Sequence, residues 1–139
     1  MEIDTSTDFG ARATRHLEGD RIVWLATVGP DGTPQPSPVW FLWDGDTVLI
    51  YSQPSTPKLR NIAQRPRVSL HFNCTESGGD VVVITGDASV DTGVPPVDAN
   101  ADYRDKYADG IRAIGMTPET FARAYSVPIR IRPTSLRGH

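Results

Sequence analysis

Apolar residues recur along the chain at helical spacing first and then in short runs typical of strands. Phe9, Ala13 and Leu17 follow a helical period within residues 8–19, and Gly19 is suited to end that helix. Short apolar or alternating runs follow, separated by turn residues such as those at 29–32 and 44–46. The expected strands are residues 21–28, 34–43, 47–52, 67–73, 81–90 and 127–132.

Three more helices are expected between these strands. Ser55 or Thr56 can cap a helix that has Pro57 at its first position and stops before Pro66. Two short helices are expected at residues 101–108 and from residue 117 onward. The short links favour antiparallel pairing, so the fold class is mainly β (α+β): a six-stranded antiparallel barrel with peripheral short helices, in a single domain over residues 1–139.

Composition and charge exclude several classes of protein. No apolar run approaches the roughly 20 residues of a membrane helix, and residues 1–4 lack the pattern of a signal peptide. Cys74 is the single cysteine, which fits a reducing compartment, and the expected localisation is cytoplasmic. The formal net charge of -3 predicts neither nucleic-acid nor membrane binding. Two basic segments, around Lys58 and Arg130, instead favour a small anionic ligand, although solvated surface charges would give the same pattern.

Residues 51–61 carry the strongest candidate for such a ligand site. A helix N-terminus attracts anions, and here its first turn carries Lys58, with Arg60 beyond it. Cations are electrostatically misplaced at that end of a helix unless something negative lies beside them. Ser52 adds a hydroxyl donor. The residues alone support a phosphate site and an ordinary capped helix about equally.

A second candidate is the proline-rich strand at residues 33–40. Pro34, Pro36 and Pro38 hold an extended backbone that could lie along a flat ring, with Trp40 beside it. The same prolines would also protect an edge strand from pairing, which is the commoner situation.

Other motifs are missing. The three histidines have no metal-ligand spacing, so no metal site is expected. Nucleophile-elbow, phosphate-loop and dinucleotide-binding motifs do not occur either.

Several segments together resemble a known family. Residues 24–28 with 31–40 are similar to the first hairpin of the pyridoxamine 5′-phosphate oxidase-like, FMN-binding split-barrel superfamily. Tyr51-Ser52, the Lys58-x-Arg60-Asn61 segment and residues 127–134 resemble its actinobacterial branch, which uses the deazaflavin coenzyme F420. The resemblance covers most of residues 9–137.

This resemblance implies a split β-barrel that forms a homodimer, with each cofactor in a groove between two chains. It also implies a set of cofactor-binding residues: Gln35, Pro36, Ser37, Pro38, Trp40, Tyr51, Ser52, Lys58, Arg60, Asn61, Asp80 and Arg130. Asp80 and Arg130 would lie near the partner's site. No catalytic side chain is assigned, because the cofactor carries the hydride chemistry.

Three functions follow from the resemblance. The first is an F420-dependent oxidoreductase that transfers hydride to a small conjugated substrate. The second is an FMN-dependent oxidoreductase of the same fold, and the third is a carrier of F420, FMN or haem without turnover. The chain lacks the C-terminal extension of pyridoxamine phosphate oxidases, so activity on pyridoxamine phosphate is not expected.

Overall fold

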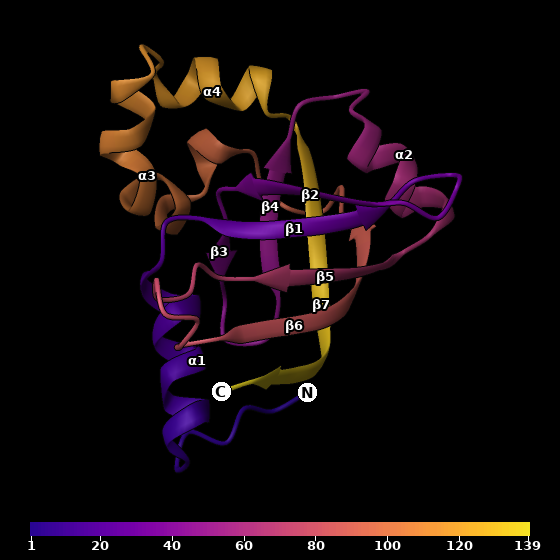
Figure 1. Cartoon of the computed structure of the whole chain (residues 1–139). Coiled ribbons are helices and arrows are strands. Elements are labelled where there is room, and N and C mark those ends of the chain that lie inside the picture. The colour runs from indigo at the N-terminus through magenta and orange to yellow at the C-terminus, as the bar shows by residue number, and fades with distance from the viewer.

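The chain forms one curled antiparallel sheet with four α-helices around it (Figure 1). The computed structural model describes all residues, 1–139. Its strands are β1 (Val23–Val28), β2 (Pro34–Val39), β3 (Leu42–Trp43), β4 (Val48–Ser52), β5 (Arg67–His71), β6 (Val82–Val90) and β7 (Val127–Gly138). Its helices are α1 (Asp8–Gly19), α2 (Pro57–Gln64), α3 (Ala101–Ala113) and α4 (Pro118–Ala124), with a 3-10 turn η1 (Val97–Ala99). The mixed α+β class is as expected from the sequence.

The sheet has seven strands, not the six that the sequence predicted, in the order β2-β1-β5-β6-β7-β4-β3. The additional strand arises because the expected strand 34–43 is divided into β2 and β3. Between them the Phe41 N–H donates to the Tyr107 hydroxyl at 2.9 Å, so this backbone group binds a helix side chain instead of a strand. β2 pairs with β1 and β3 pairs with β4, at opposite edges of the curled sheet.

β7 is longer than predicted, because it continues through Pro133 to Gly138. Its pairing with β6 shifts register between Thr85 and Gly86, where Gly86 faces Pro133. A Cβ added at Gly86 would lie 2.6 Å from the Arg132 carbonyl oxygen. Glycine therefore permits the close backbone approach at this irregularity, and the strand passes a proline that would normally end it.

β4 joins the two hydrophobic cores because both of its faces are buried. Val48 and Ile50 point into the main core, which also contains Leu17 of α1. Leu49 and Tyr51 point to the other side, into a second core with the aromatic residues of α3 and α4. We call residues 97–125, which cover this outer side of β4, the cap.

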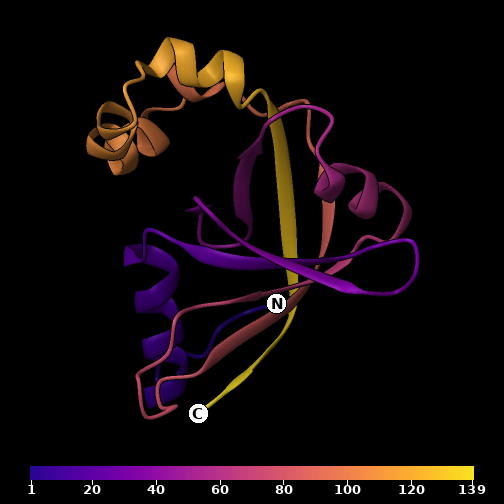
Figure 2. The ribbon, with the colours of Figure 1, turned by 45° about the horizontal axis from the view of Figure 1, so that its top comes forward.

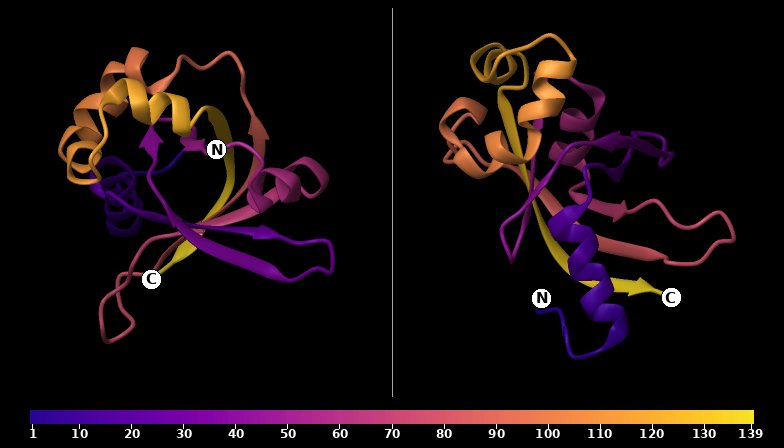
Figure 3. Two further views of the ribbon diagram at one scale, coloured as in Figure 1. Left: turned by 90° about the horizontal axis from the view of Figure 1, so that it is seen from above. Right: turned by 90° about the vertical axis from the view of Figure 1, so that its left-hand side faces the viewer.

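The cap and α1 lie at opposite ends of the molecule (Figure 2). Both chain termini lie at the α1 end (Figure 3). The cap leaves the sheet after β6 and returns at β7, where Val90 faces Ile129. No helix is long and apolar enough to cross a membrane, and no group of three or more acidic, His or Cys side chains could hold a metal ion.

Candidate functional site

The first turn of α2, which follows the turn after β4, contains no acidic residue. Thr56 is the N-cap residue, but its side chain makes no capping hydrogen bond. Its hydroxyl lies instead 3.2 Å from that of Ser52, which also donates to the Gln53 carbonyl at 2.8 Å. Ser55 adopts φ 62°, a left-handed conformation that is strained for serine. The first turn of α2 is thus held in place by its neighbours and remains open to an anion.

Lys58 is half-buried in this first turn. Burial lowers the pKa of its ammonium group, and no neighbouring charge or hydrogen bond opposes that effect. No carboxylate lies within ion-pair distance of it. A cation partly removed from water and left without a counter-ion is the polar group that an anionic ligand would stabilise most.

Lys58 lines a hollow of about 400 Å³ between the sheet and the cap, which we call the main hollow. From the sheet side and the β4–α2 segment it is lined by Pro38, Val39, Trp40, Tyr51, Gln53 and Lys58, and from the cap by Tyr103, Ile114, Phe121 and Tyr125. Its walls are mostly apolar and aromatic, which suits a planar ring, and Lys58 supplies one fixed positive charge.

Trp40 attaches the cap to the sheet. Its indole stacks on the ring of Tyr107 at 4.6 Å and on that of Phe121 at 5.4 Å between centroids. Gly110 of α3 lies against the indole edge, where an added Cβ would come within 3.1 Å. This contact explains why α3 continues past residue 108, where the sequence predicted its end: Gly110 is a close-packing position and not a helix stop.

Tyr103 is the cap residue beneath this hollow. Its side chain is fully buried, and its hydroxyl is a buried polar atom with no hydrogen-bond partner. Burial, reinforced by the nearby tyrosines, raises the pKa of this hydroxyl far above its usual value. It therefore remains protonated and can act as a donor.

Three of the predicted cofactor-binding residues lie together around a second hollow, which is lined by polar side chains and two prolines. Gln35, Arg60 and Asn61 line about 360 Å³ together with Arg65. The buried Asn61 amide donates to the Thr27 hydroxyl and to the Gln35 side-chain oxygen, both at 3.0 Å. Asn61 thus joins α2 to β1 and β2. Arg60 donates to the Ser55 carbonyl at 3.0 Å. Lys58 and Arg60, both expected to serve the cofactor phosphate or its neighbouring chain, line different hollows.

The remaining predicted residues of the proline strand lie along the edge of the sheet. β2 is the first strand in the sheet order and pairs only with β1. Pro36 is exposed and Ser37 is partly exposed, whereas Pro38 lines the main hollow. The expectation of an edge strand that carries prolines therefore agrees with the structure.

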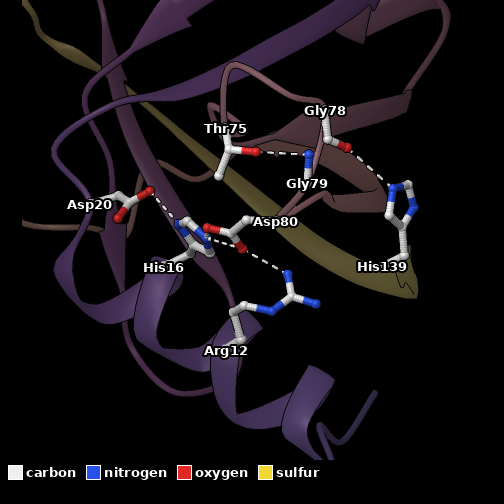
Figure 4. A network of polar contacts seen from close by, with 8 residues as sticks. All are labelled: Arg12, His16, Asp20, Thr75, Gly78, Gly79, Asp80 and His139. Atoms are coloured by element: carbon white, nitrogen blue, oxygen red, sulfur yellow. Dashed lines mark hydrogen bonds and ion pairs between the residues drawn. The ribbon is translucent and has the colours of Figure 1, made fainter.

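Asp80 belongs to a polar cluster at the α1 end, which we call the α1 cluster: Arg12, His16, Asp20 and Asp80 (Figure 4). Asp80 accepts from Arg12 at 2.7 Å, and one of its oxygens lies 2.9 Å from His16 Nε2. His16 Nδ1 lies 2.6 Å from Asp20. Asp80 holds φ 55°, so the cluster secures the loop before β6 in a conformation that is rare for aspartate.

Arg130 is likewise engaged within the chain. It donates to Asp91 at 2.7 Å, to the Thr47 hydroxyl at 2.6 Å and to Asp44 at 3.2 Å. Neither Asp80 nor Arg130 lines the main hollow. The site that the structure assembles therefore contains Pro38, Trp40, Tyr51 and Lys58 from the predicted set.

The cap residues of the main hollow were not among the predicted site residues. Tyr103, Ile114 and Phe121 reach it because the cap folds back over β4, a contact that joins residues about fifty or more positions apart. Their apolar spacing along the chain predicts only a buried helix face. The one local signal was aromatic content in a polar stretch, with Tyr103 and Tyr107 one turn apart on α3.

Comparison with known proteins agrees with this fold. The model of the family described as pyridoxamine 5′-phosphate oxidase matches residues 10–125. No curated protein matches the chain. A solved F420 reductase is 26% identical, with a TM-score of 0.64 over 87% of this chain and 92% of that one.

Two further solved structures share the fold at lower identity. A protein from Listeria innocua described as a putative pyridoxamine 5′-phosphate oxidase is 22% identical, with a TM-score of 0.66 over 91% of this chain and 94% of that one. The haem-storage protein HutZ from Vibrio cholerae is 16% identical, with a TM-score of 0.61 over 99% of this chain and 95% of that one.

Proposed function

Because this chain belongs to the pyridoxamine 5′-phosphate oxidase family, we propose that it is an oxidoreductase that binds a flavin-type cofactor in the main hollow. Coenzyme F420 is the first choice and FMN the second. The observation that carries the proposal is Lys58, a half-buried cation without a counter-ion in the lining of a largely aromatic hollow. The similarity to a solved F420 reductase supports the choice of F420.

The residues of the hollow fit a planar ring that carries a phosphate. Lys58, together with the first turn of α2, would bind the phosphate, because both supply positive potential without an internal acceptor. Pro38, Trp40 and Tyr51 would lie against the ring and exclude water from it. The Tyr103 hydroxyl, which belongs to a lining residue, is a buried polar group without a partner in the chain.

When bound, a reduced deazaflavin or flavin supplies the hydride for a conjugated organic acceptor. The chain's own contribution is binding, orientation and exclusion of water. The ionisable side chains of the hollow are Lys58 and three tyrosines, and no carboxylate or histidine lines it. This composition supports a role in which the protein places the cofactor and takes no proton itself.

We further propose that two copies associate, as the family resemblance implies. The outward face of β1 and β5 carries Trp24 stacked on His71 at 6.0 Å, and Ile22 before β1 is 40% exposed. Partly exposed aromatic and aliphatic side chains of this kind are typical of a surface that a second chain covers. Asp80 and Arg130, with their predicted role beside a partner's cofactor, belong to this part of the proposal.

A titration of the purified protein with F420 and with FMN tests the cofactor. We expect quenching of F420 fluorescence at micromolar concentrations and weaker quenching of FMN. Binding of neither ligand would contradict the proposal. Binding of haem in their place, followed by its Soret absorption band, would favour a carrier. If F420 binds but a panel of quinones, enones and nitroaromatics does not oxidise reduced F420, the protein is a carrier of F420 and not an oxidoreductase.

A further inference from the structure

The Tyr103 hydroxyl differs from the other buried side-chain polar atoms, which have hydrogen-bond partners. It is the buried side-chain polar atom of this structure that has no hydrogen-bond partner. The residue is 0% exposed and lies on the cap side of the main hollow. Burying a hydroxyl without a partner destabilises a fold, and phenylalanine would fill the same volume without that penalty.

The neighbours of Tyr103 present rings to it rather than acceptors. The rings of Tyr51 and Tyr107 each lie 4.8 Å from its own, and Phe121 lies 6.3 Å away. The other two tyrosines use their hydroxyls within the chain. Tyr51 donates to the Pro95 carbonyl at 2.6 Å, and Tyr107 accepts from the Phe41 N–H at 2.9 Å and donates to the Arg21 carbonyl at 2.8 Å.

We propose that Tyr103 is a ligand-binding residue, whose hydroxyl donates a hydrogen bond to a carbonyl oxygen of the planar ring held in the main hollow. This inference rests on the proposed function and adds a recognition group from the cap to it. Because burial keeps the hydroxyl protonated by raising its pKa, it has a proton to donate to an acceptor on the ring. Flavin and deazaflavin rings both carry carbonyl groups that can accept.

Tyr103 and Lys58 then recognise opposite chemical features of one ligand. Lys58 lies on the α2 side and binds an anionic group, whereas Tyr103 lies on the cap side and binds the ring. The two contacts are independent, so their effects on affinity should add. A ring without a carbonyl, or a phosphate without a ring, would use only one of them.

The test compares two identical substitutions one helical turn apart, Tyr103→Phe and Tyr107→Phe. Each variant and the wild-type protein are titrated with F420 and FMN, and their thermal unfolding is measured without ligand. Tyr103→Phe should weaken cofactor binding about three- to tenfold, the effect of one neutral hydrogen bond, and should leave the melting temperature unchanged or higher. Tyr107→Phe should lower the melting temperature and leave affinity unchanged, because its hydroxyl serves only the chain.

A change in the visible absorption band of the bound cofactor gives a second measure. Loss of a hydrogen bond to the ring carbonyl should shift that band in Tyr103→Phe relative to wild type, and should not do so in Tyr107→Phe. Unchanged affinity and an unchanged band in Tyr103→Phe would overturn this inference alone. Wild-type protein that binds neither cofactor would overturn the proposed function and the inference with it.

Discussion

The two ends of the molecule differ in how they treat their polar side chains. At the α1 end, Asp80 binds both Arg12 and His16 within the chain. At the cap end, Tyr103 is fully buried and Lys58 is half-buried, and neither polar group binds a partner within the chain. Satisfied groups stabilise the fold, and unsatisfied ones mark where something else must bind. This contrast identifies the main hollow more sharply than its size does.

A substitution of Lys58 is the most direct test of this contrast between the two ends of the molecule. Lys58→Met removes the charge but keeps the length of the side chain, and we expect affinity for F420 or FMN to fall about 10- to 100-fold, since a charged hydrogen bond contributes roughly 1.5–3 kcal/mol. Thermal stability should not fall, because no contact within the chain is lost. Isothermal calorimetry measures the first effect and thermal unfolding the second.

The chain offers a matched control, because it has one other lysine. Lys106 is also half-buried, and burial lowers its pKa to about 8. It donates to the Phe41 carbonyl at 2.9 Å and lies 3.7 Å above the Phe41 ring. Lys106→Met should therefore reduce stability and leave cofactor affinity unchanged. A loss of affinity in both variants would show that Lys58 acts through stability and not through the ligand.

Asn61 tests whether a predicted site residue instead stabilises the fold. The sequence predicted a ligand contact for it, but the structure gives its side chain partners within the chain. Asn61→Ala removes hydrogen bonds to Thr27 and Gln35 at a buried position, and should reduce the free energy of unfolding by about 1–3 kcal/mol. Urea denaturation measures this loss, with the exposed Gln64→Ala on the same helix as control. Undiminished stability with strongly reduced cofactor affinity would restore the predicted role in cofactor binding.

The α1 cluster should show its contribution through pH. Burial of the His16 imidazole opposes its protonation, but hydrogen bonds and charges from Asp20 and Asp80 outweigh burial and raise its pKa above 6.5. Because the folded state holds the proton more tightly, the stabilisation is complete below pH 6.5 and is lost as pH rises through the raised value. Arg12 also faces Asp80, and its charge persists throughout this range.

His16→Gln should therefore cost on the order of 1 kcal/mol at pH 5.5 and less at pH 8.5, since the pair is partly exposed to solvent. Urea denaturation at the two pH values measures the difference. His139→Gln is the control, because the His139 side chain approaches the same loop only at the Gly78 carbonyl, 3.3 Å away. An equal loss for His16→Gln at both pH values would contradict the ionic role of the cluster.

Local patterns in the sequence predicted most of the secondary structure. The predicted N-terminal helix matches α1, and the helix after Pro57 is α2, ended before Pro66 as expected. The divided strand, the continuation of β7 and the full length of α3 could not be predicted in the same way. Each depends on a contact between distant residues: Phe41 with Tyr107, Gly86 with Arg132, and Gly110 with Trp40.

The residues of the candidate site also fall into those that local sequence patterns predict and those that only the packed structure reveals. Lys58 was found because a cation at the start of a helix is a local anomaly in the sequence. The cap's contribution could not be found, since nothing near Tyr103 in the sequence shows that its hydroxyl lacks a partner. Unsatisfied burial is a property of the packed structure, and a linear pattern does not contain it.

The cap leaves and re-enters the sheet at facing positions, Val90 of β6 and Ile129 of β7. The pairing of β6 with β7 therefore anchors both ends of the cap. The length and composition of the cap can change without altering the register of these two strands. For protein engineering, the same geometry makes the cap, residues 97–125, the segment in which the aromatic lining of the main hollow can be varied while the register of the sheet is kept.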